Sequence, residues 1–461
     1  MNKYLSDDIV AISTPLGHSG IGVIRLSGPN VISIVKDIFI PFKKEKDISK
    51  VPSHTLHYGK ISDGKRIIDE VMVAILKAPN TYTREDMVEI YAHGGPIPLQ
   101  EILNLILNKG ARLAERGEFT KRAFLNGRID LLQAEGILDV IYARSSKSLD
   151  IAIRKLEGES SEILKEIKKE VERLRIYLEA VLDFPEDVSD LERKEWINSL
   201  KNLSEKVKNL IERAERGEWL KGGYRVVLVG RPNVGKSSLF NALMREERVI
   251  VTPIPGTTRD YIEGELILSG YLIRLFDTAG IREPKDEIEA IGIKKTQEII
   301  KKANLILFLI DISEPLKRED EELFKEVYRE DAKIILVLNK IDLEIKIKER
   351  ELEEKFPNVP KIYISTLTRE RLDLLEEIIV NHIKEEESLD VLFFNTYHLQ
   401  ELRKSYDLLT QSLDILEKPL WGMDVLAENL FEIEKIFGNI LGEEVSIDIV
   451  DKIFENFCVG K

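Results

Sequence analysis

The chain has 461 residues, a length that predicts about three domains, and its single cysteine excludes an internal disulfide framework. Its formal net charge of −14 argues against non-specific nucleic-acid binding by the whole surface, so such a partner would need a local basic patch. The N-terminus lacks a basic-then-apolar segment, and no long apolar run follows. We therefore expect a cytoplasmic protein that does not cross a membrane.

The first 118 residues are predicted to form an α+β domain. Gly and Pro turns separate apolar, β-branched runs, and helical spacing predicts one helix from Pro98 to Asn108. Arg25 and Glu89 each fall inside an apolar strand. Either each points to the solvated face of its strand, or the two belong to a pocket that binds an anion or a heterocycle. The predicted strands cover residues 9–13, 22–28, 71–76 and 87–91.

Helical spacing dominates two segments on either side of residues 221–387. In the first segment, a short helix ends near Gly127, the next is capped by Asp130, and a charged helix of about 35 residues then extends to Asp183. Helical spacing resumes at Tyr397 and continues to the C-terminus. The fold class is therefore multidomain. We expect an N-terminal α+β domain (1–118), an all-α helical domain in two parts (119–220 and 388–461), and an α/β domain (221–387) inserted into it.

The stretch from Tyr224 to Leu243 has the strand, glycine-rich loop and helix of a P-loop. Glycines let backbone N–H groups turn toward phosphate oxygens, and the helix N-terminus adds partial positive charge. Lys236 can reach the β- and γ-phosphates, and the Ser237 hydroxyl can ligate Mg²⁺. The predicted contacts in this loop are Asn233, Val234, Gly235, Lys236, Ser237 and Ser238.

Two further strand ends indicate which nucleotide binds. Asp277 ends an apolar strand and suits Mg²⁺ through water, and the Gly280 N–H can meet the γ-phosphate. Asp342 follows another buried strand, and its carboxylate can accept two N–H bonds from guanine, whereas adenine offers none. The order of motifs is that of a Ras-like GTPase. The residues predicted to contact GTP here are Asp277, Thr278, Ala279, Gly280, Asn339, Lys340 and Asp342.

A switch loop is expected between the P-loop and Asp277. Thr258 is placed to complete Mg²⁺ coordination and to sense the γ-phosphate, which would order the loop only with triphosphate bound. The predicted GTP contacts in this loop are Thr252, Pro253, Ile254, Pro255, Gly256, Thr257 and Thr258.

The hydrolytic residue is not the customary glutamine. Ile281 occupies that position, and an aliphatic side chain cannot orient water by hydrogen bonding. Asn233 in the P-loop could help bind a monovalent cation beside the phosphates, or it could simply be a tolerant turn residue. The nearby polar candidates for positioning the attacking water are Arg282, Glu283, Glu287 and Glu289.

Cys458 lies next to an amphipathic helix near the C-terminus. A cysteine in this position is usually a small core residue. The alternative is a thiolate poised by Lys461.

These motifs together resemble the MnmE (TrmE) family of tRNA-modifying GTPases from end to end. The matching stretches are residues 20–28, 86–95, 117–131 and 182–185, the Gly256–Asp260 switch motif and the Phe457–Lys461 tail.

The resemblance implies specific roles in the GTP site. Glu289 matches the catalytic glutamate that positions water, and Lys236 and Asn233 join it as catalytic residues. Ser237 and Thr258 would hold Mg²⁺. The implied K⁺ ligands are Asn233, Thr252, Ile254 and Thr257.

The resemblance also implies a second cofactor and several partners. The N-terminal domain would dimerise and bind a 5-formyl- or 5,10-methylene-tetrahydrofolate as one-carbon donor, through Arg25, Glu89, Arg128 and Lys461. G domains would pair when K⁺ and GTP are bound. With the flavoprotein MnmG, which carries FAD, the family adds an aminomethyl or carboxymethylaminomethyl group at carbon-5 of the wobble uridine in certain tRNAs.

Three places depart from the family pattern, and one of them is Tyr397–His398, where an Arg-His pair is usual. Pro253 and Pro255 stiffen the switch loop. Residues 365–367 read Ser-Thr-Leu where Ser-Ala-Lys is usual, and we expect this loop to weaken nucleotide affinity. The alternative functions are a GTP-switched assembly factor for ribosomes or another RNA particle, and a regulatory switch without a metabolic role. The assembly factor would not need a folate pocket, and fast intrinsic hydrolysis in KCl would be a poor fit to the regulatory switch.

Overall fold

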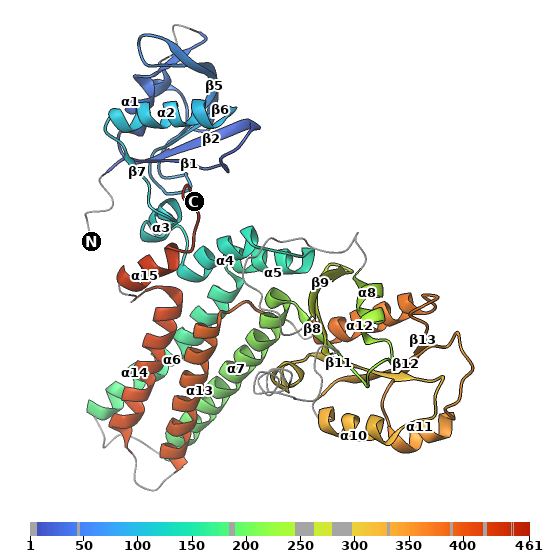
Figure 1. Ribbon diagram of the computed structural model, residues 1–461. Helices are drawn as coiled ribbons and strands as arrows, with labels where there is room; N and C mark the ends of the chain where they lie inside the picture. The colour runs from blue at the N-terminus through green and yellow to red at the C-terminus, as the bar shows by residue number, and fades with distance from the viewer. Residues whose placement is uncertain are drawn as a thin grey trace, which may run out of the picture. The chain divides into compact units, whose positions relative to one another are not determined.

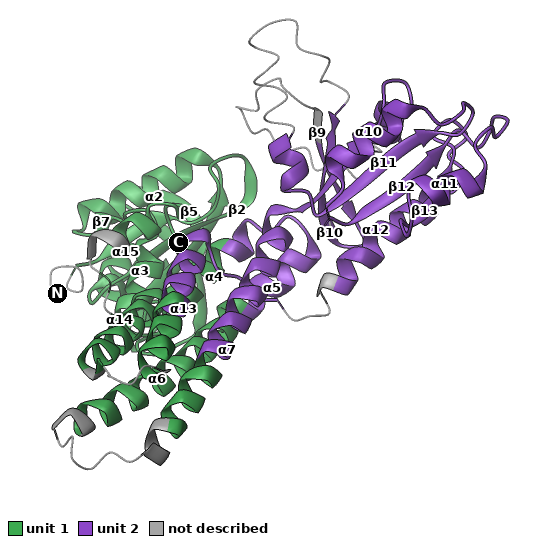
Figure 2. Cartoon of the chain, turned by 90° about the horizontal axis from the view of Figure 1, so that it is seen from below, with its two compact units in different colours: residues 1–138, 155–203, 407–461 green, residues 139–154, 204–406 purple. Residues whose placement is uncertain are grey.

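The computed structural model describes most of the chain as two compact units (Figure 2). Unit 1 contains residues 1–138, 155–203 and 407–461, and unit 2 contains residues 139–154 and 204–406. The described residues are 7–43, 47–183, 190–244, 262–278, 297–329, 332–387, 391–417, 422–443, 445 and 447–461.

Unit 1 opens with a seven-stranded sheet in the order β3-β4-β5-β6-β2-β1-β7 (Figure 1). All neighbours pair antiparallel except β1 and β7, which are parallel. The predicted strands are confirmed within a few residues, whereas β3, β4 and β7 were not predicted. The bounds are β1 Ile9–Ile12, β2 Ser19–Ser27, β3 Phe39–Pro41, β4 Thr55–Ser62, β5 Ile67–Leu76, β6 Met87–Gly94 and β7 Arg112–Leu113.

Helices α1 (Val31–Lys36) and α2 (Pro96–Asn108) cover one face of this sheet. The strands alternate, so their apolar residues, such as Ile24 and Ile90, form one core with residues of both helices, such as Val35 and Ile102. The helix predicted for residues 98–108 is confirmed as α2. It begins two residues earlier than predicted, because proline is tolerated in the first turn of a helix.

Strand register decides what lies on the opposite face. Arg25 pairs with Glu89, and Glu89 pairs in turn with Ala74 on the next strand. Two residues along β6, Tyr91 stands opposite Met72. Because side chains alternate between faces, Arg25, Glu89 and Tyr91 share the face that α1 and α2 leave uncovered.

The rest of unit 1 is helical. The prediction of a single charged helix of about 35 residues before Asp183 is wrong. Two helices, α5 (Ser146–Glu157) and α6 (Glu159–Asp183), are separated by Gly158, which has φ of +98°. Only glycine adopts this left-handed conformation without strain. Long helices α7 and α13 contribute to both units. The remaining bounds are α3 Glu118–Leu125, α4 Leu131–Ile141, α7 Asp190–Gly222, α13 Thr396–Glu417, α14 Met423–Leu441 and α15 Ile447–Phe454.

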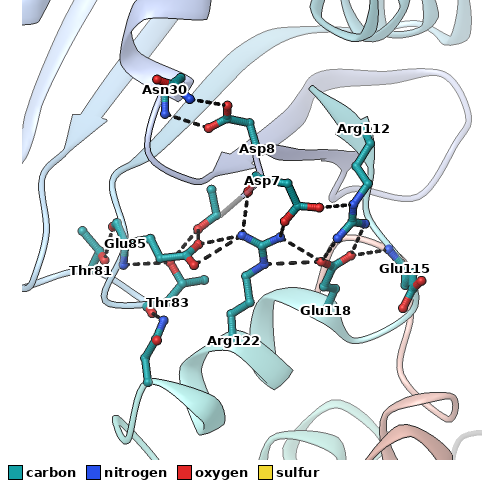
Figure 3. A network of polar contacts seen from close by, with 12 residues as sticks. Asp7, Asp8, Asn30, Thr81, Thr83, Glu85, Arg112, Glu115, Glu118 and Arg122 are labelled. Atoms are coloured by element: carbon teal, nitrogen blue, oxygen red, sulfur yellow. Dashed lines mark hydrogen bonds and ion pairs between the residues drawn. The ribbon is translucent and has the colours of Figure 1, made fainter. Parts of the chain in front are cut away.

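A buried network of charges fixes α3 against the first sheet (Figure 3). The Arg122 side chain is 1 % exposed and donates to Asp7 (2.7 Å), Glu85 (3.1 Å) and Glu118 (2.9 Å). Burial alone would raise the pKa of Glu118, but hydrogen bonds from Arg112 and Arg122 lower it overall. The network therefore keeps both signs of charge buried and paired, the condition under which buried ions persist.

Unit 2 contains a six-stranded sheet in the order β13-β12-β11-β8-β10-β9, in which only β9 is antiparallel to its neighbour. Apolar clusters cover both faces, as expected for a mostly parallel sheet buried on both sides. The Ras-like α/β architecture predicted from the motifs is confirmed. The bounds are β8 Tyr224–Val229, β9 Ile262–Leu268, β10 Tyr271–Asp277, β11 Leu305–Asp311, β12 Ile334–Asn339, β13 Lys361–Ile364, α8 Lys236–Leu243, α10 Arg318–Val327, α11 Glu349–Lys355 and α12 Leu372–Glu387.

Helix α5 packs on this sheet. Ile151 and Ala152 belong to the same apolar cluster as Leu266 and Tyr271 of the β9–β10 hairpin. Within the described ranges, no helix is both long and apolar enough to cross a membrane.

Candidate functional site

The P-loop joins β8 to α8 through backbone conformations that side chains rarely adopt. Gly230, Asn233 and Gly235 have φ of +155°, +66° and +104°. A Cβ at Gly235 would lie 2.2 Å from the Asn339 side-chain nitrogen, so only glycine fits there. The loop therefore brings its backbone close to the neighbouring strand end, as a phosphate cradle requires.

Lys236 lies buried in this loop, and no carboxylate of the described residues is in hydrogen-bond contact with it. Its Nζ donates to the carbonyl oxygens of Gly230 (2.6 Å) and Arg231 (2.7 Å). Burial lowers the pKa of Lys236, and the Asp277 carboxylate offsets part of this effect. The adjacent Arg231 adds a smaller lowering effect on this pKa, although its Nε donates to the fully buried Asp320 (2.6 Å). A phosphate oxygen would give the ammonium a charged acceptor in place of two carbonyls.

The magnesium ligands predicted at the two motifs meet in space. Ser237 Oγ lies 2.8 Å from Asp277 Oδ2, so a hydroxyl and a carboxylate oxygen converge beside Lys236. This oxygen donor set fits Mg²⁺, which binds few protein oxygens and keeps several waters. Thr278 lies next to them, but its hydroxyl donates to the Leu228 carbonyl (2.7 Å) and serves the fold of the loop.

The residues predicted to recognise the base follow the ends of β12 and β13. The Asn339 side-chain N–H donates to the Val234 carbonyl (2.8 Å), which ties this strand end to the P-loop. Asp342 accepts from the Ser365 hydroxyl (2.5 Å), and Lys340 pairs with Asp311. One cavity is lined by P-loop residues and by Thr278, Lys340, Asp342 and Thr366. The structure thus brings together the predicted P-loop and base-recognition residues.

Other predicted residues lie outside the described residues. These are Thr252, Pro253, Ile254, Pro255, Gly256, Thr257 and Thr258 of the switch loop, Ala279 and Gly280 of the motif after Asp277, and Glu289 with the other water-positioning candidates.

A second constellation lies in unit 1, on the uncovered face of the first sheet. Arg25 Nε donates to Glu89 Oε1 (2.8 Å), and the Tyr91 hydroxyl donates to Glu89 Oε2 (2.6 Å). The Arg25 and Glu89 side chains are 19 % and 16 % exposed. They are therefore a paired, mostly buried couple rather than two solvated side chains. The carboxylate also raises the pKa of Tyr91 to about 12.

The C-terminal tail completes this constellation. The Gly460 carbonyl accepts from Arg25 (3.2 Å) and from the Ser13 hydroxyl (3.1 Å), and Gly460 has φ of +92°. Burial and the neighbouring Arg25 lower the pKa of Lys461, whereas Glu89 and Cys458 raise it. The last residue of the chain thus lies within electrostatic reach of the Arg25–Glu89 pair.

An aromatic side chain links Arg128 to the same place. Tyr82 has the Arg128 guanidinium 4.7 Å from its ring centre and the Arg25 guanidinium 5.7 Å from it. The Tyr82 hydroxyl lies 2.9 Å from that of Thr120 on α3. Four residues that are far apart in the sequence are therefore gathered in one place, which we call the Arg25 cluster: Arg25, Glu89, Arg128 and Lys461, with the aromatic rings of Tyr82 and Tyr91.

Sequence reasoning missed Tyr82, Tyr91 and Gly460. Strand alternation could have identified Tyr91, which stands two residues after Glu89 on the same face. No local pattern identifies Gly460, because its contacts depend on how the tail folds back. The prediction that Cys458 is a core residue is wrong: its side chain is exposed, because the tail's last turn buries Phe457 and Gly460 instead.

Comparisons with known proteins show which family the chain resembles. A family model described as the MnmE helical domain matches residues 131–458. A second model, described as the GTP-binding protein TrmE N-terminus, matches residues 8–128.

Curated relatives match the chain over nearly its whole length. The protein named tRNA modification GTPase MnmE from Thermoanaerobacter pseudethanolicus is 45 % identical, over 99 % of both chains. The protein of the same name from Bacillus subtilis is 40 % identical, over 99 % of this chain and 100 % of its own.

Among solved structures, a variant of Aquifex aeolicus Era bound to GDP·AlF4⁻ covers 40 % of this chain and 66 % of its own at 29 % identity, with a TM-score of 0.29. A TM-score of this size supports no inference. The full-length identities and the two family models do: the chain belongs to the MnmE (TrmE) family of tRNA modification GTPases.

Proposed function

We propose that this protein is a K⁺-stimulated GTPase that acts with the flavoprotein MnmG on tRNA. The product is the aminomethyl or carboxymethylaminomethyl group at carbon-5 of the wobble uridine, and the one-carbon donor is 5-formyl- or 5,10-methylene-tetrahydrofolate. The observation that carries the proposal is the Arg25 cluster, in which Arg25, Glu89, Arg128 and Lys461 converge from four separate stretches of chain.

The chemistry of this cluster fits a reduced folate. A carboxylate has about four acceptor positions, so Glu89 can accept ring N–H groups while it stays bonded to Arg25 and Tyr91. Tyr82 offers an aromatic surface for a heterocycle, and Arg128 and Lys461 supply positive charge for carboxylates. The folate supplies a one-carbon unit when it is bound. The chain's own part is to orient it and to exclude water.

In unit 2 the residues around the P-loop bind and orient GTP. The loop N–H groups and Lys236 neutralise phosphate charge, Ser237 and Asp277 hold Mg²⁺ directly or through water, and Asp342 reads guanine. Mg²⁺ supplies further positive charge to the phosphates when it is bound. These tasks need no glutamine after Asp277.

The remaining hydrolytic parts rest on the family resemblance. Asn233 with Thr252, Ile254 and Thr257 would hold K⁺, Thr258 would complete the Mg²⁺ site, and Glu289 would position the attacking water. The left-handed backbone at Asn233 supports a special role for this residue, since few non-glycine residues adopt it.

Two homodimer contacts belong to the proposal. Unit 1 would pair through the N-terminal sheet, whose uncovered face carries the exposed Leu56, Tyr58 and Met72. Exposed apolar groups on one sheet face favour a protein partner. The G domains would pair through their K⁺-ordered loops, so that hydrolysis drives the partner's movement. We place the protein in the cytoplasm, where its tRNA substrates are.

A folate titration tests the Arg25 cluster. Wild-type protein should bind 5-formyl-tetrahydrofolate, and Arg25→Ala should weaken binding about tenfold or more, because a charge-assisted contact and the partner of Glu89 are both lost. Arg66→Ala, which removes an exposed arginine of the same domain, is the matched control. Equal affinities for all three proteins would refute a folate site at Arg25.

Two measurements test the remaining parts. Hydrolysis should be markedly faster in KCl than in NaCl, and Glu289→Ala should abolish it while GTP binding persists. Mass spectrometry of tRNA nucleosides from a deletion strain should show loss of the wobble modification. Unchanged wobble uridines, with GTP-dependent co-sedimentation on ribosomal subunits, would favour the assembly-factor alternative.

A further inference from the structure

The Asn339 side-chain amide makes three hydrogen bonds, which use both N–H donors and the carbonyl oxygen. Its nitrogen donates to the Val234 carbonyl (2.8 Å) and to the Thr366 hydroxyl (3.3 Å), and its oxygen accepts from the Thr366 backbone N–H (3.1 Å). The amide cannot be turned over, because a carbonyl can only accept and an N–H can only donate. Asn339 is fully buried, so a lost partner would not be replaced freely by water.

Thr366 makes two of these three bonds. One involves its backbone N–H and the other its side-chain hydroxyl. The other hydroxyl of this loop is already engaged, because Ser365 Oγ donates to Asp342 and accepts from the Thr368 N–H (3.0 Å). Ile364, which precedes Ser365, has no polar side chain that could replace the Thr366 hydroxyl. An alanine at position 366, which the family's usual Ser-Ala-Lys loop would place there, could supply the backbone bond but not the hydroxyl.

Asn339 links Thr366 to the P-loop through a hydrogen bond to the backbone. The Val234 carbonyl that it binds lies directly before Gly235 and Lys236, and Gly235 packs against the amide so closely that a Cβ would collide with it. The position of Asn339 therefore helps to fix where the P-loop backbone lies.

We infer that Thr366 is a positioning residue of the guanine-nucleotide site: its hydroxyl holds the Asn339 amide, and through it the P-loop. The Ser365–Leu367 loop then strengthens nucleotide binding through Thr366, where the sequence alone led us to expect a weaker site. Thr366 acts on the phosphate side through Asn339, and Ser365 acts on the base side through Asp342.

Nucleotide titrations of the full-length protein test this. Thr366→Val keeps the shape but removes the hydroxyl, and it should raise the Kd for GDP roughly fivefold to tenfold, because a buried N–H loses its acceptor. Thr366→Ala should behave alike, and Thr366→Ser should restore the wild-type Kd to within about twofold. Thr368→Val, on the same loop, is the matched control and should bind like wild type.

Titration with IDP tests whether Thr366 acts through Asn339, because the base of IDP lacks the exocyclic amine that would donate a hydrogen bond to Asp342. If Thr366 acts through Asn339, Thr366→Val should weaken IDP and GDP by the same factor, and kcat at saturating GTP should stay near the wild-type value. An unchanged Kd for GDP in both Thr366→Val and Thr366→Ala would overturn the inference. So would a loss confined to GDP, or a Thr366→Ser protein as weak as Thr366→Val, since either would mean that the hydroxyl does not act on Asn339.

Discussion

Among the residues that the structure describes, each compact unit contains one lysine whose pKa is lowered, and in both the main cause is burial. Lys236 lies near Asp277 and Arg231, and Lys461 lies near Glu89 and Arg25. The two surroundings differ in what the arginine does. Arg231 is paired with the buried Asp320 of helix α10, whereas Arg25 is paired with the carboxylate of its own cluster.

This difference indicates what each site is suited to bind. In the nucleotide site the Lys236 ammonium donates to two loop carbonyls and to no other group of the described chain, so a polyanion gains a charged partner there. In the Arg25 cluster the Arg25–Glu89 pair is already neutralised, so its ligand must gain by hydrogen bonding and stacking as well as by charge. The following variants test this comparison.

The largest effect is expected at Lys236. Lys236→Ala should slow GTP hydrolysis on the order of a thousandfold. Among the described residues of the P-loop site, Lys236 is the only buried lysine, and the variant removes its positive charge. Phosphate release measures the rate. Folate binding by the same variant should not change, and a parallel loss of folate affinity would mean that the two sites are not independent.

Breaking the Arg231–Asp320 pair should cost about 3 kcal/mol of unit 2 stability, because the guanidinium stays buried without its counter-charge. Asp320→Asn keeps the side-chain shape. Hydrogen exchange of the β8 and β11 amides reports the stability of this unit alone. Glu322→Gln, on the same helix in an exposed pair with Arg318, should leave the exchange unchanged.

Breaking the Arg25–Glu89 pair with Glu89→Gln should cost unit 1 less, about 1 kcal/mol, because the pair is partly exposed and the Gly460 carbonyl still accepts from Arg25. Hydrogen exchange of β2 and β6 amides measures it. A cost as large as that at Asp320 would contradict the contrast between the two arginines.

The smallest effect concerns pH and Lys461. Its pKa in the folded protein is lower than in the unfolded chain, so the unfolded state holds more protons between the two values, and stability should rise with pH across that interval. Lys461→Met should remove this rise and shift the melting temperature by about 1 °C at pH 8. Lys452→Met, an exposed lysine on α15, gives the baseline. An identical pH profile for wild type and Lys461→Met would contradict the lowered pKa.

Much of the fold could be predicted from local pattern. The P-loop, the strands that end at Asp277 and Asn339, and helix α2 all lie where apolar spacing and turn residues indicated. The short edge strands β3 and β7 were missed, because two or three residues carry no periodicity. The break at Gly158 was also missed, because a glycine within a helical pattern is often tolerated.

The sequence by itself determined the nucleotide site, because strand, loop and helix follow one another and their residues are neighbours along the chain. The family resemblance named four residues of the Arg25 cluster, but only the tertiary structure shows that they meet, with Tyr82, Tyr91 and Gly460 beside them. Arg25 meets Gly460 across 435 residues, through strand register on one side and the folded-back tail on the other. The tertiary structure also decided the role that we infer for Thr366, because its hydroxyl accepts a hydrogen bond from the Asn339 amide at the end of the neighbouring strand. Contacts between distant segments depend on packing and register, and no spacing within a sequence encodes them directly.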